Sequence, residues 1–168
     1  MNKYPQVQAV FFEDDGKIPN NPKLPLLIYS QVFDASDVIA AIFSENNWTK
    51  AWRNGIFNYH HYHSTSHEVL GVEAGWAEVQ LGGGANGIVF TLKAGDMVVI
   101  PAGVGHKRLN ASTDFTVIGA YPDGHEYDLL TGKADERPEN LHRIAQLPLP
   151  TTDPVFGVDG VLFDYWVY

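Results

Sequence analysis

The chain of 168 residues is long enough to bury a core, and this length predicts a single domain. Hydrophobic residues make up 45% of it and charged residues 18%, a balance that excludes a disordered chain and fits a folded globular protein. Acidic residues outnumber basic ones by 20 to 11, so the net charge of −9 disfavours binding to nucleic acid or to an anionic membrane, and the absence of cysteine excludes disulfide bonds and thiolate ligands.

Extended segments separated by turns open the chain. A strand is predicted over residues 7–12, and an acidic turn follows it. Three prolines within residues 18–25 indicate an ordered loop or arm, after which residues 26–32 form the next predicted strand. The residues after Met1 lack the long apolar core of a signal peptide, and no apolar run reaches the length of a membrane span, so we expect a cytoplasmic protein.

One short helix is predicted in the N-terminal third of the chain, over roughly residues 36–46. The evidence is a change of period, because apolar residues recur at the spacing of a buried helix face: Val38, Ile39, Ile42 and Phe43. Asp34 or Ser36 is a suitable N-cap, and the Asn46-Asn47 pair ends the pattern. We predict no other complete helix.

The next segment carries a cluster of histidines. Residues 55–63 are β-rich and bounded by turns, which predicts a strand containing His61 and His63. Residues two apart on a strand share a face, with Cα atoms roughly 6.5–7 Å apart, so both imidazoles can converge on one metal ion. A second predicted strand, residues 68–72, follows a polar turn. If it returns antiparallel, its first residue, Glu68, lies beside His63 and faces the same way as the apolar residues that alternate with it.

The remaining segments complete an all-β pattern. Further strands are predicted over residues 76–81, 88–92, 96–100, 106–110 and 115–121. The Gly-rich loop 82–87 is interpreted as a hairpin turn, because neither Lys-Ser/Thr nor a helix follows it. Beyond it the chain is polar, with a helical turn at 138–142 and a packed extended arm over 147–167. Many short strands with Gly/Pro turns predict one barrel or sandwich domain spanning residues 1–168, with a core of about 26–122.

Ten positions in the central third of the chain resemble the two sequence motifs of the cupins. The first motif is matched by Gly55, His61, His63, Glu68 and Gly75, and the second by Gly95, Pro101, Gly103, His106 and Asn110. The surrounding sequence is similar to that of the YjlB-type cupins, small bacterial proteins. This resemblance implies a double-stranded β-helix, or jelly-roll, barrel with one metal held by three histidines and one glutamate. It does not imply a substrate, because cupins differ widely in activity.

The expected metal ligands are therefore His61, His63, Glu68 and His106. Imidazole nitrogens with one carboxylate suit a divalent transition metal, and Fe, Mn, Ni and Zn all remain open. The alternative is that these are ordinary strand histidines, bonded to backbone carbonyls or exposed. Because all four residues stand at motif positions, we favour the metal site.

Four further residues are candidates for the open side of this site: Tyr59, His67, Arg108 and Tyr121. Arg108 has the strand parity of His106 and either binds a carboxylate or phosphate of a substrate or forms an ion pair at the barrel rim. His67 has the opposite parity to Glu68, so we expect it to face outward, with an indirect role at the metal as the alternative.

The hypothesis that this pattern favours is a metal-dependent enzyme acting on a small polar metabolite, by oxygenation or by isomerase or lyase chemistry. The alternative is a non-catalytic protein that binds or senses a small molecule and uses the metal structurally. We expect a small-molecule partner and no nucleic acid or membrane partner. The extended arms and open barrel edges also predict a homodimer.

Overall fold

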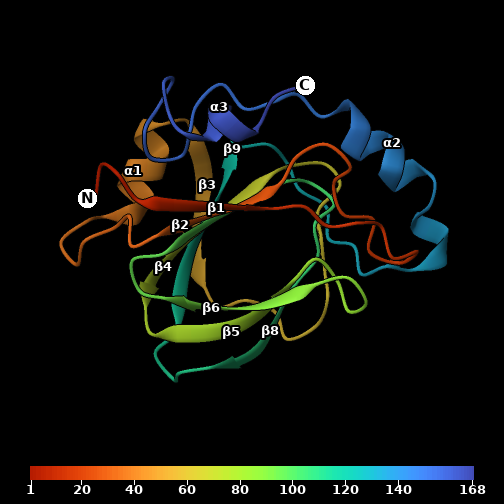
Figure 1. Ribbon diagram of the computed structural model, residues 1–168, viewed down its shortest axis with the longest axis horizontal. Coiled ribbons are helices and arrows are strands. Elements are labelled where there is room, and N and C mark those ends of the chain that lie inside the picture. The colour runs from red at the N-terminus through yellow and green to blue at the C-terminus, as the bar shows by residue number, and fades with distance from the viewer.

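The computed structural model describes residues 1–168, and two antiparallel β-sheets form its centre (Figure 1). The larger sheet has the strand order β1-β2-β7-β4-β9-β3 and the smaller one the order β6-β5-β8. The strands are β1 (Gln6–Val10), β2 (Leu26–Ser30), β3 (Trp48–Asn54), β4 (Glu68–Ala74), β5 (Trp76–Leu81), β6 (Ile88–Lys93), β7 (Met97–Ile100), β8 (His106–Ala111) and β9 (Thr116–Pro122). The predicted all-β barrel is therefore confirmed.

Side chains alternate in direction along the strands of the larger sheet, so they contribute to two layers of hydrophobic core, one on each face of the sheet. In β4, Leu70 and Val72 face the smaller sheet and pack there with residues such as Val79 and Leu81 of β5. Val69, which precedes Leu70, belongs to a second cluster on the opposite face of the larger sheet. Because both faces of this sheet are covered, its central strands are continuous apolar runs with no polar face.

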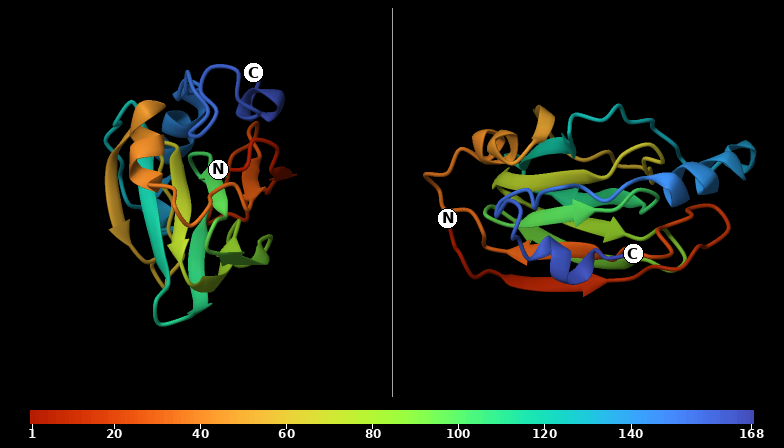
Figure 2. Two further views of the ribbon diagram at one scale, coloured as in Figure 1. Left: turned by 90° about the vertical axis from the view of Figure 1, so that its left-hand side faces the viewer. Right: turned by 90° about the horizontal axis from the view of Figure 1, so that it is seen from above.

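Helix α1 (Ile39–Glu45) and the C-terminal arm cover the outer face of the larger sheet. Seen from above in Figure 2, the C-terminal segment lies over the strands. Trp166 is only 1% exposed, and its indole N–H donates to the carbonyl of Pro25 at 2.8 Å. Gly71 of β4 lets α1 approach closely, since a Cβ there would lie 2.7 Å from Cγ2 of Ile39. The arm is thus part of the core.

Helix α1 starts three residues later than the sequence pattern predicted. Its N-cap is Val38, which offers no side-chain hydrogen bond, so neither Asp34 nor Ser36 caps the helix. Asp34 and Asp37 instead close a separate turn. The amide of Asp37 donates to the carbonyl of Asp34 at 3.0 Å, and the amide of Asp34 donates to the carboxylate of Asp37 at 2.7 Å. Local side-chain bonding has replaced the first helical turn.

The prediction of a single helix was wrong. A 3₁₀ turn, η1 (Ala134–Glu136), precedes α2 (Glu139–Gln146), which buries Asn140 and Ile144 one turn apart and so continues past the expected helical turn. Helix α3 (Leu162–Tyr165) occupies part of the arm that was expected to be extended. The buried carboxylate of Asp153 fixes its start by accepting the amide N–H of Leu162 at 3.1 Å. No helix of the structure combines the length and apolarity needed to cross a membrane.

We predict that the protein is a homodimer, joined through the edge of the larger sheet. Strand β1 pairs with β2 on one side only, so its other side presents unpaired backbone groups. Light scattering across micromolar concentrations should return twice the mass of one chain. Gln8 is exposed on β1, and Gln8→Lys should weaken the association by placing like charges near each other. A single-chain mass for the unaltered protein would contradict the prediction.

Candidate metal centre

The segment that carries the first two histidines is not the regular strand that its composition predicted. Strand β3 ends at Asn54, and the residues after it touch β8 at two points. The amide of Arg108 donates to the carbonyl of Phe57 at 2.9 Å, and His61 exchanges backbone hydrogen bonds of 3.0 and 3.3 Å with His106. Between these contacts residues 58–60 lie opposite Lys107 alone, so the segment bulges. Both His61 and His63 nevertheless line the same cavity.

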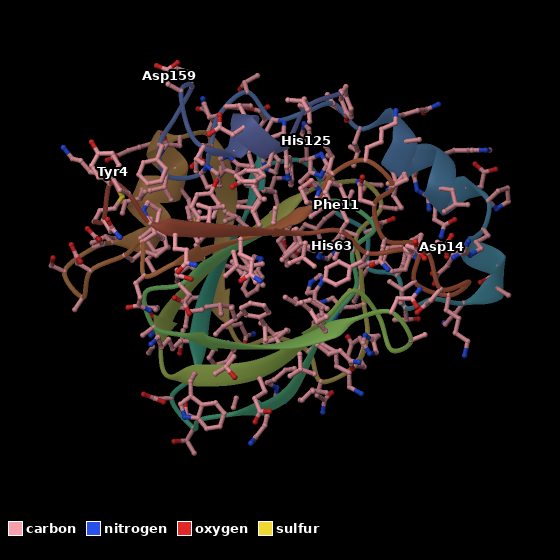
Figure 3. The ribbon with its side chains drawn as sticks, viewed as in Figure 1. Tyr4, Phe11, Asp14, His63, His125 and Asp159 are labelled. Atoms are coloured by element: carbon pink, nitrogen blue, oxygen red, sulfur yellow. The ribbon has the colours of Figure 1, made fainter.

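Three of the four predicted ligands form a compact cluster. Glu68 Oε2 lies 3.2 Å from Nε2 of His63 and 3.2 Å from Nε2 of His106, and one donor atom from each residue lies within 4.8 Å of the others. All three side chains are buried, and Figure 3 shows His63 in the interior, between the levels of β1 and β6. His61 stands at the edge of the cluster, its ring centroid 4.0 Å from that of His106 and 6.1 Å from that of His63.

Hydrogen bonds to backbone carbonyls orient all three imidazoles. Nδ1 of His61 lies 3.0 Å from the carbonyl of Tyr59, Nδ1 of His106 lies 3.1 Å from that of Val104, and Nδ1 of His63 contacts that of Asp128. A carbonyl oxygen only accepts, so each Nδ1 carries the hydrogen. In the neutral rings every Nε2 then has a free lone pair, which is the tautomer that metal-ligating histidines use.

The buried carboxylate of Glu68 completes a donor set that fits a cation. Its Oε2 accepts no hydrogen bond although solvent does not reach it. Burial by itself would raise the pKa of Glu68, but the neighbouring His63 and His106 outweigh burial and hold it well below its usual range. Burial lowers the pKa of His63, but the charge of Glu68 outweighs burial and raises that pKa, so without a metal a proton on Nε2 of His63 balances the carboxylate, and a metal ion would replace that proton. Burial and the neighbouring His106 lower the pKa of His61 to about 3, so that ring is neutral. A negative charge surrounded by nitrogen lone pairs has the chemistry of a divalent metal site.

Tyr121 holds the carboxylate of Glu68 from the other side. Its hydroxyl donates to Glu68 Oε1 at 3.3 Å and accepts the indole N–H of Trp52 at 2.8 Å. Burial, with the charge of Glu68, raises the pKa of Tyr121 far above its usual value, so the phenol keeps its proton. The ring of Tyr127 stacks on Tyr121 with centroids 4.2 Å apart. Trp52, Tyr127 and the carbonyl of Asp128 therefore support the cluster, and sequence reasoning missed all three.

We predict that Tyr121→Phe lowers metal affinity about tenfold, because it removes a hydrogen bond that orients a ligand carboxylate and leaves the indole N–H of Trp52 without its acceptor. Metal titration at one pH and ionic strength measures the change. Tyr59→Phe is the control, since the Tyr59 ring lies outside the cavity lining. Equal affinities in both variants would remove Tyr121 from any role at the cluster.

A cavity of about 850 Å³ opens onto the cluster. Its apolar wall includes Trp52, Ile56, Phe57, Leu70, Phe115 and Leu129. Of the four open-side candidates, Arg108 and Tyr121 line it. Tyr59 does not line it. Its carbonyl orients His61, while its ring stacks on Phe57 with centroids 5.0 Å apart.

His67 lies on the outer face of the larger sheet, away from the cluster. Its Nδ1 accepts the amide N–H of Ala102 at 2.9 Å, and Nε2 lies 3.3 Å from the carbonyl of Pro148. The ring also contacts Trp166, with centroids 4.8 Å apart. Strand parity therefore predicted its direction, but the side chain is 2% exposed and joins the barrel to the C-terminal arm. Its hydrogen sits on Nε2, the opposite tautomer to that of the three cavity histidines.

Comparison with known proteins identifies the family. The family model described as "Cupin domain" matches residues 54–118, which include the whole cluster. The uncharacterized protein YjlB of Bacillus subtilis (strain 168) is 46% identical over 162 residues, covering 96% of this chain and 98% of that protein. The chain is a cupin of the YjlB family. Its two cupin motifs are therefore the segments that supply His63, Glu68 and His106, a cluster that could bind a metal.

Two solved structures are among those similar to this chain. A conserved protein with a double-stranded β-helix domain from Klebsiella pneumoniae is 20% identical, with a TM-score of 0.39 and coverage of 79% of this chain and 84% of that one. A variant of oxalate decarboxylase from Bacillus subtilis is 16% identical, with a TM-score of 0.42 and coverage of 76% of this chain and 33% of that one.

Proposed function

We propose that this cupin is a metal-dependent enzyme of the cytoplasm that acts on a small polar metabolite, by oxygenation or by isomerase or lyase chemistry. The ligands are His63, Glu68 and His106, with His61 as the fourth after a small movement of its ring. A divalent transition metal held there supplies Lewis acidity toward a substrate oxygen and, as Fe(II), redox capacity as well.

One observation carries this proposal: the histidine rings are already oriented and in the tautomer that ligates a metal, and they border a cavity. Backbone carbonyls fix the Nδ1–H tautomer of each histidine, which costs no further reorganisation when a ligand binds. A purely structural metal site is closed by its protein ligands, whereas this cluster borders about 850 Å³ of accessible space.

The residues around the cluster have distinct roles in this proposal. Tyr121 keeps its proton and donates it to Glu68, which holds the carboxylate in place. The side chains of Trp52 and Leu70 give the cavity an apolar wall next to the cluster. Beside such a wall the electrostatic contacts between the protein and a bound substrate are stronger than in water.

Activity screens on metal-loaded protein test the proposal. Samples reconstituted separately with Fe(II) and Mn(II) are assayed for oxygen uptake with an electrode and for isomerisation of sugars and sugar acids. Turnover that disappears in His106→Ala supports an enzyme. Stoichiometric metal without turnover in any sample would favour the alternative, a binding or sensing protein with a structural metal.

A further inference from the structure

Arg108 carries the unpartnered positive charge of the cavity. It stands on β8 two residues from His106, and both line the cavity. Its Nε is buried and has no hydrogen-bond partner, and its guanidinium forms no ion pair with any of the chain's 20 acidic residues. A buried guanidinium N–H without an acceptor costs desolvation free energy, and a bound ligand that accepts this N–H would remove that cost.

The other three arginines of the chain all have partners. Arg53 donates to Glu73 at 2.6 Å. Arg137 forms a two-pronged ion pair with one aspartate, at 2.5 and 2.7 Å, and Arg143 donates to the hydroxyl of a serine at 2.8 Å. In a chain with nearly twice as many acidic as basic residues, an arginine finds a carboxylate easily. That Arg108 has none distinguishes it from an ordinary ion pair at the barrel rim.

The charges of the cavity favour an anion. Glu68 is the one acidic residue in its lining, and its carboxylate belongs to the metal cluster. Arg53 also lines the cavity but is neutralised by its ion pair. A divalent metal beside Glu68, together with Arg108, leaves the cavity with a net positive charge.

The mouth of the cavity is apolar. Phe57, Tyr127 and Leu129 line it and are 52%, 45% and 44% exposed, so these side chains remain free to contact a ligand. They present two aromatic rings and an aliphatic side chain next to the charged end of the cavity. A ligand that satisfies both regions has an anionic group and an apolar body.

We infer that Arg108 binds the carboxylate of an organic acid substrate whose apolar body lies against Phe57, Tyr127 and Leu129. This inference rests on the proposed function, because it names the substrate class of the same site. A carboxylate is favoured over a phosphate because one guanidinium matches its two oxygens, whereas no lysine lines the cavity to share the charge of a phosphate dianion.

The side chain of Arg108 is not needed to hold the fold. Strand β8 is secured by backbone pairing, including the bond from the amide of Arg108 to Phe57, and the guanidinium adds no hydrogen bond to the protein. Arg108→Gln should therefore fold as the unaltered protein does. Lys107→Gln is the matched control, since it removes the same charge one residue away, from a side chain outside the cavity lining.

Isothermal titration calorimetry tests the inference with 3-phenylpropanoate and its uncharged amide, 3-phenylpropanamide. The full chain is titrated with metal bound, as Mn(II), and without metal. We expect the acid to bind at least tenfold more tightly than the amide. Arg108→Gln should remove this preference, because it should lower the affinity for the acid at least tenfold and leave the affinity for the amide unchanged. Lys107→Gln should retain the preference.

Several outcomes would overturn the inference. Equal binding of acid and amide to the unaltered protein excludes a carboxylate site, and a preference that survives in Arg108→Gln assigns the acid to another group. Tighter binding of 2-phenylethylphosphonate than of the acid would reassign the site to phosphate esters. Arg108 should bind the carboxylate in the metal-free protein as well, so its effect can be measured without any metal. A failure of the proposed metal site would therefore leave the result for Arg108 in the metal-free protein unaffected.

Discussion

Replacing His63 or His106 by alanine should leave the purified protein with almost no bound metal, against one divalent ion per unaltered chain. Each variant removes one of the three donor atoms that lie within 4.8 Å of one another, and the two that remain of this group, with His61 beside them, do not enclose an ion. His61→Ala should lower occupancy less, because the compact cluster of three survives and His61 stands at its edge. Elemental analysis of protein purified in parallel gives the occupancies.

His142→Ala is the control for this series. It removes an exposed imidazole on α2, outside the cavity lining, and should leave the metal content unchanged. Circular dichroism confirms that each variant is folded before its metal is measured. Full occupancy in the His61, His63 and His106 variants together would place the ion elsewhere in the chain.

Glu68→Gln should weaken metal binding at least tenfold, whereas His67→Gln should change it by no more than a few-fold. The glutamine keeps the shape of Glu68 but removes the one anionic ligand, and partly buried charge interactions of this kind contribute roughly 1–3 kcal/mol. His67 faces the outer layer of the core and contacts Ala102 and Pro148 in place of the cluster. Titrations of both variants with the same metal, at one pH and ionic strength, measure the difference.

A stability measurement separates the two roles further. His67→Gln should cost about 1–3 kcal/mol of unfolding free energy, because the buried amide N–H of Ala102 loses its acceptor. His67→Asn is the matched variant, since its amide oxygen occupies the place of Nδ1 and keeps that bond.

In the metal titrations, loss of metal in His67→Gln with retention in Glu68→Gln would show that the ligands form an all-histidine cluster.

Strand parity was the sequence signal that predicted the site most directly. Glu68, the first residue of β4, alternates with the apolar residues of the inner core, and His67, just before β4, has the parity of the outer core. The structure places both side chains accordingly. Parity is local, so it needs no knowledge of the fold. Tyr59, a candidate for the open side, does not line the cavity, and the bulge at residues 58–60 breaks strand alternation around it.

The supporting residues could not be predicted because their contacts are distant in sequence. Asp128 orients His63 from a polar segment 65 residues further along the chain, and no periodicity marks such a carbonyl. Trp52 of β3 contacts Tyr121 of β9 where the pairing of the two strands shifts register, and the sequence does not mark this shift. The burial of His67 could not be predicted either. Pro148 and Trp166 cover its side chain, and they belong to an arm whose position depends on tertiary packing.

The arm over the larger sheet also bears on how the protein folds as it is synthesised. Residues 147–166 leave the ribosome after β9, the last barrel strand, so the outer face of the sheet exists before its cover does. Until Leu162 and Trp166 dock, the apolar side chains of that face are open to solvent and to other nascent chains. In this interval, between completion of the barrel and arrival of the arm, the uncovered apolar face leaves the nascent chain prone to aggregation and able to bind a chaperone.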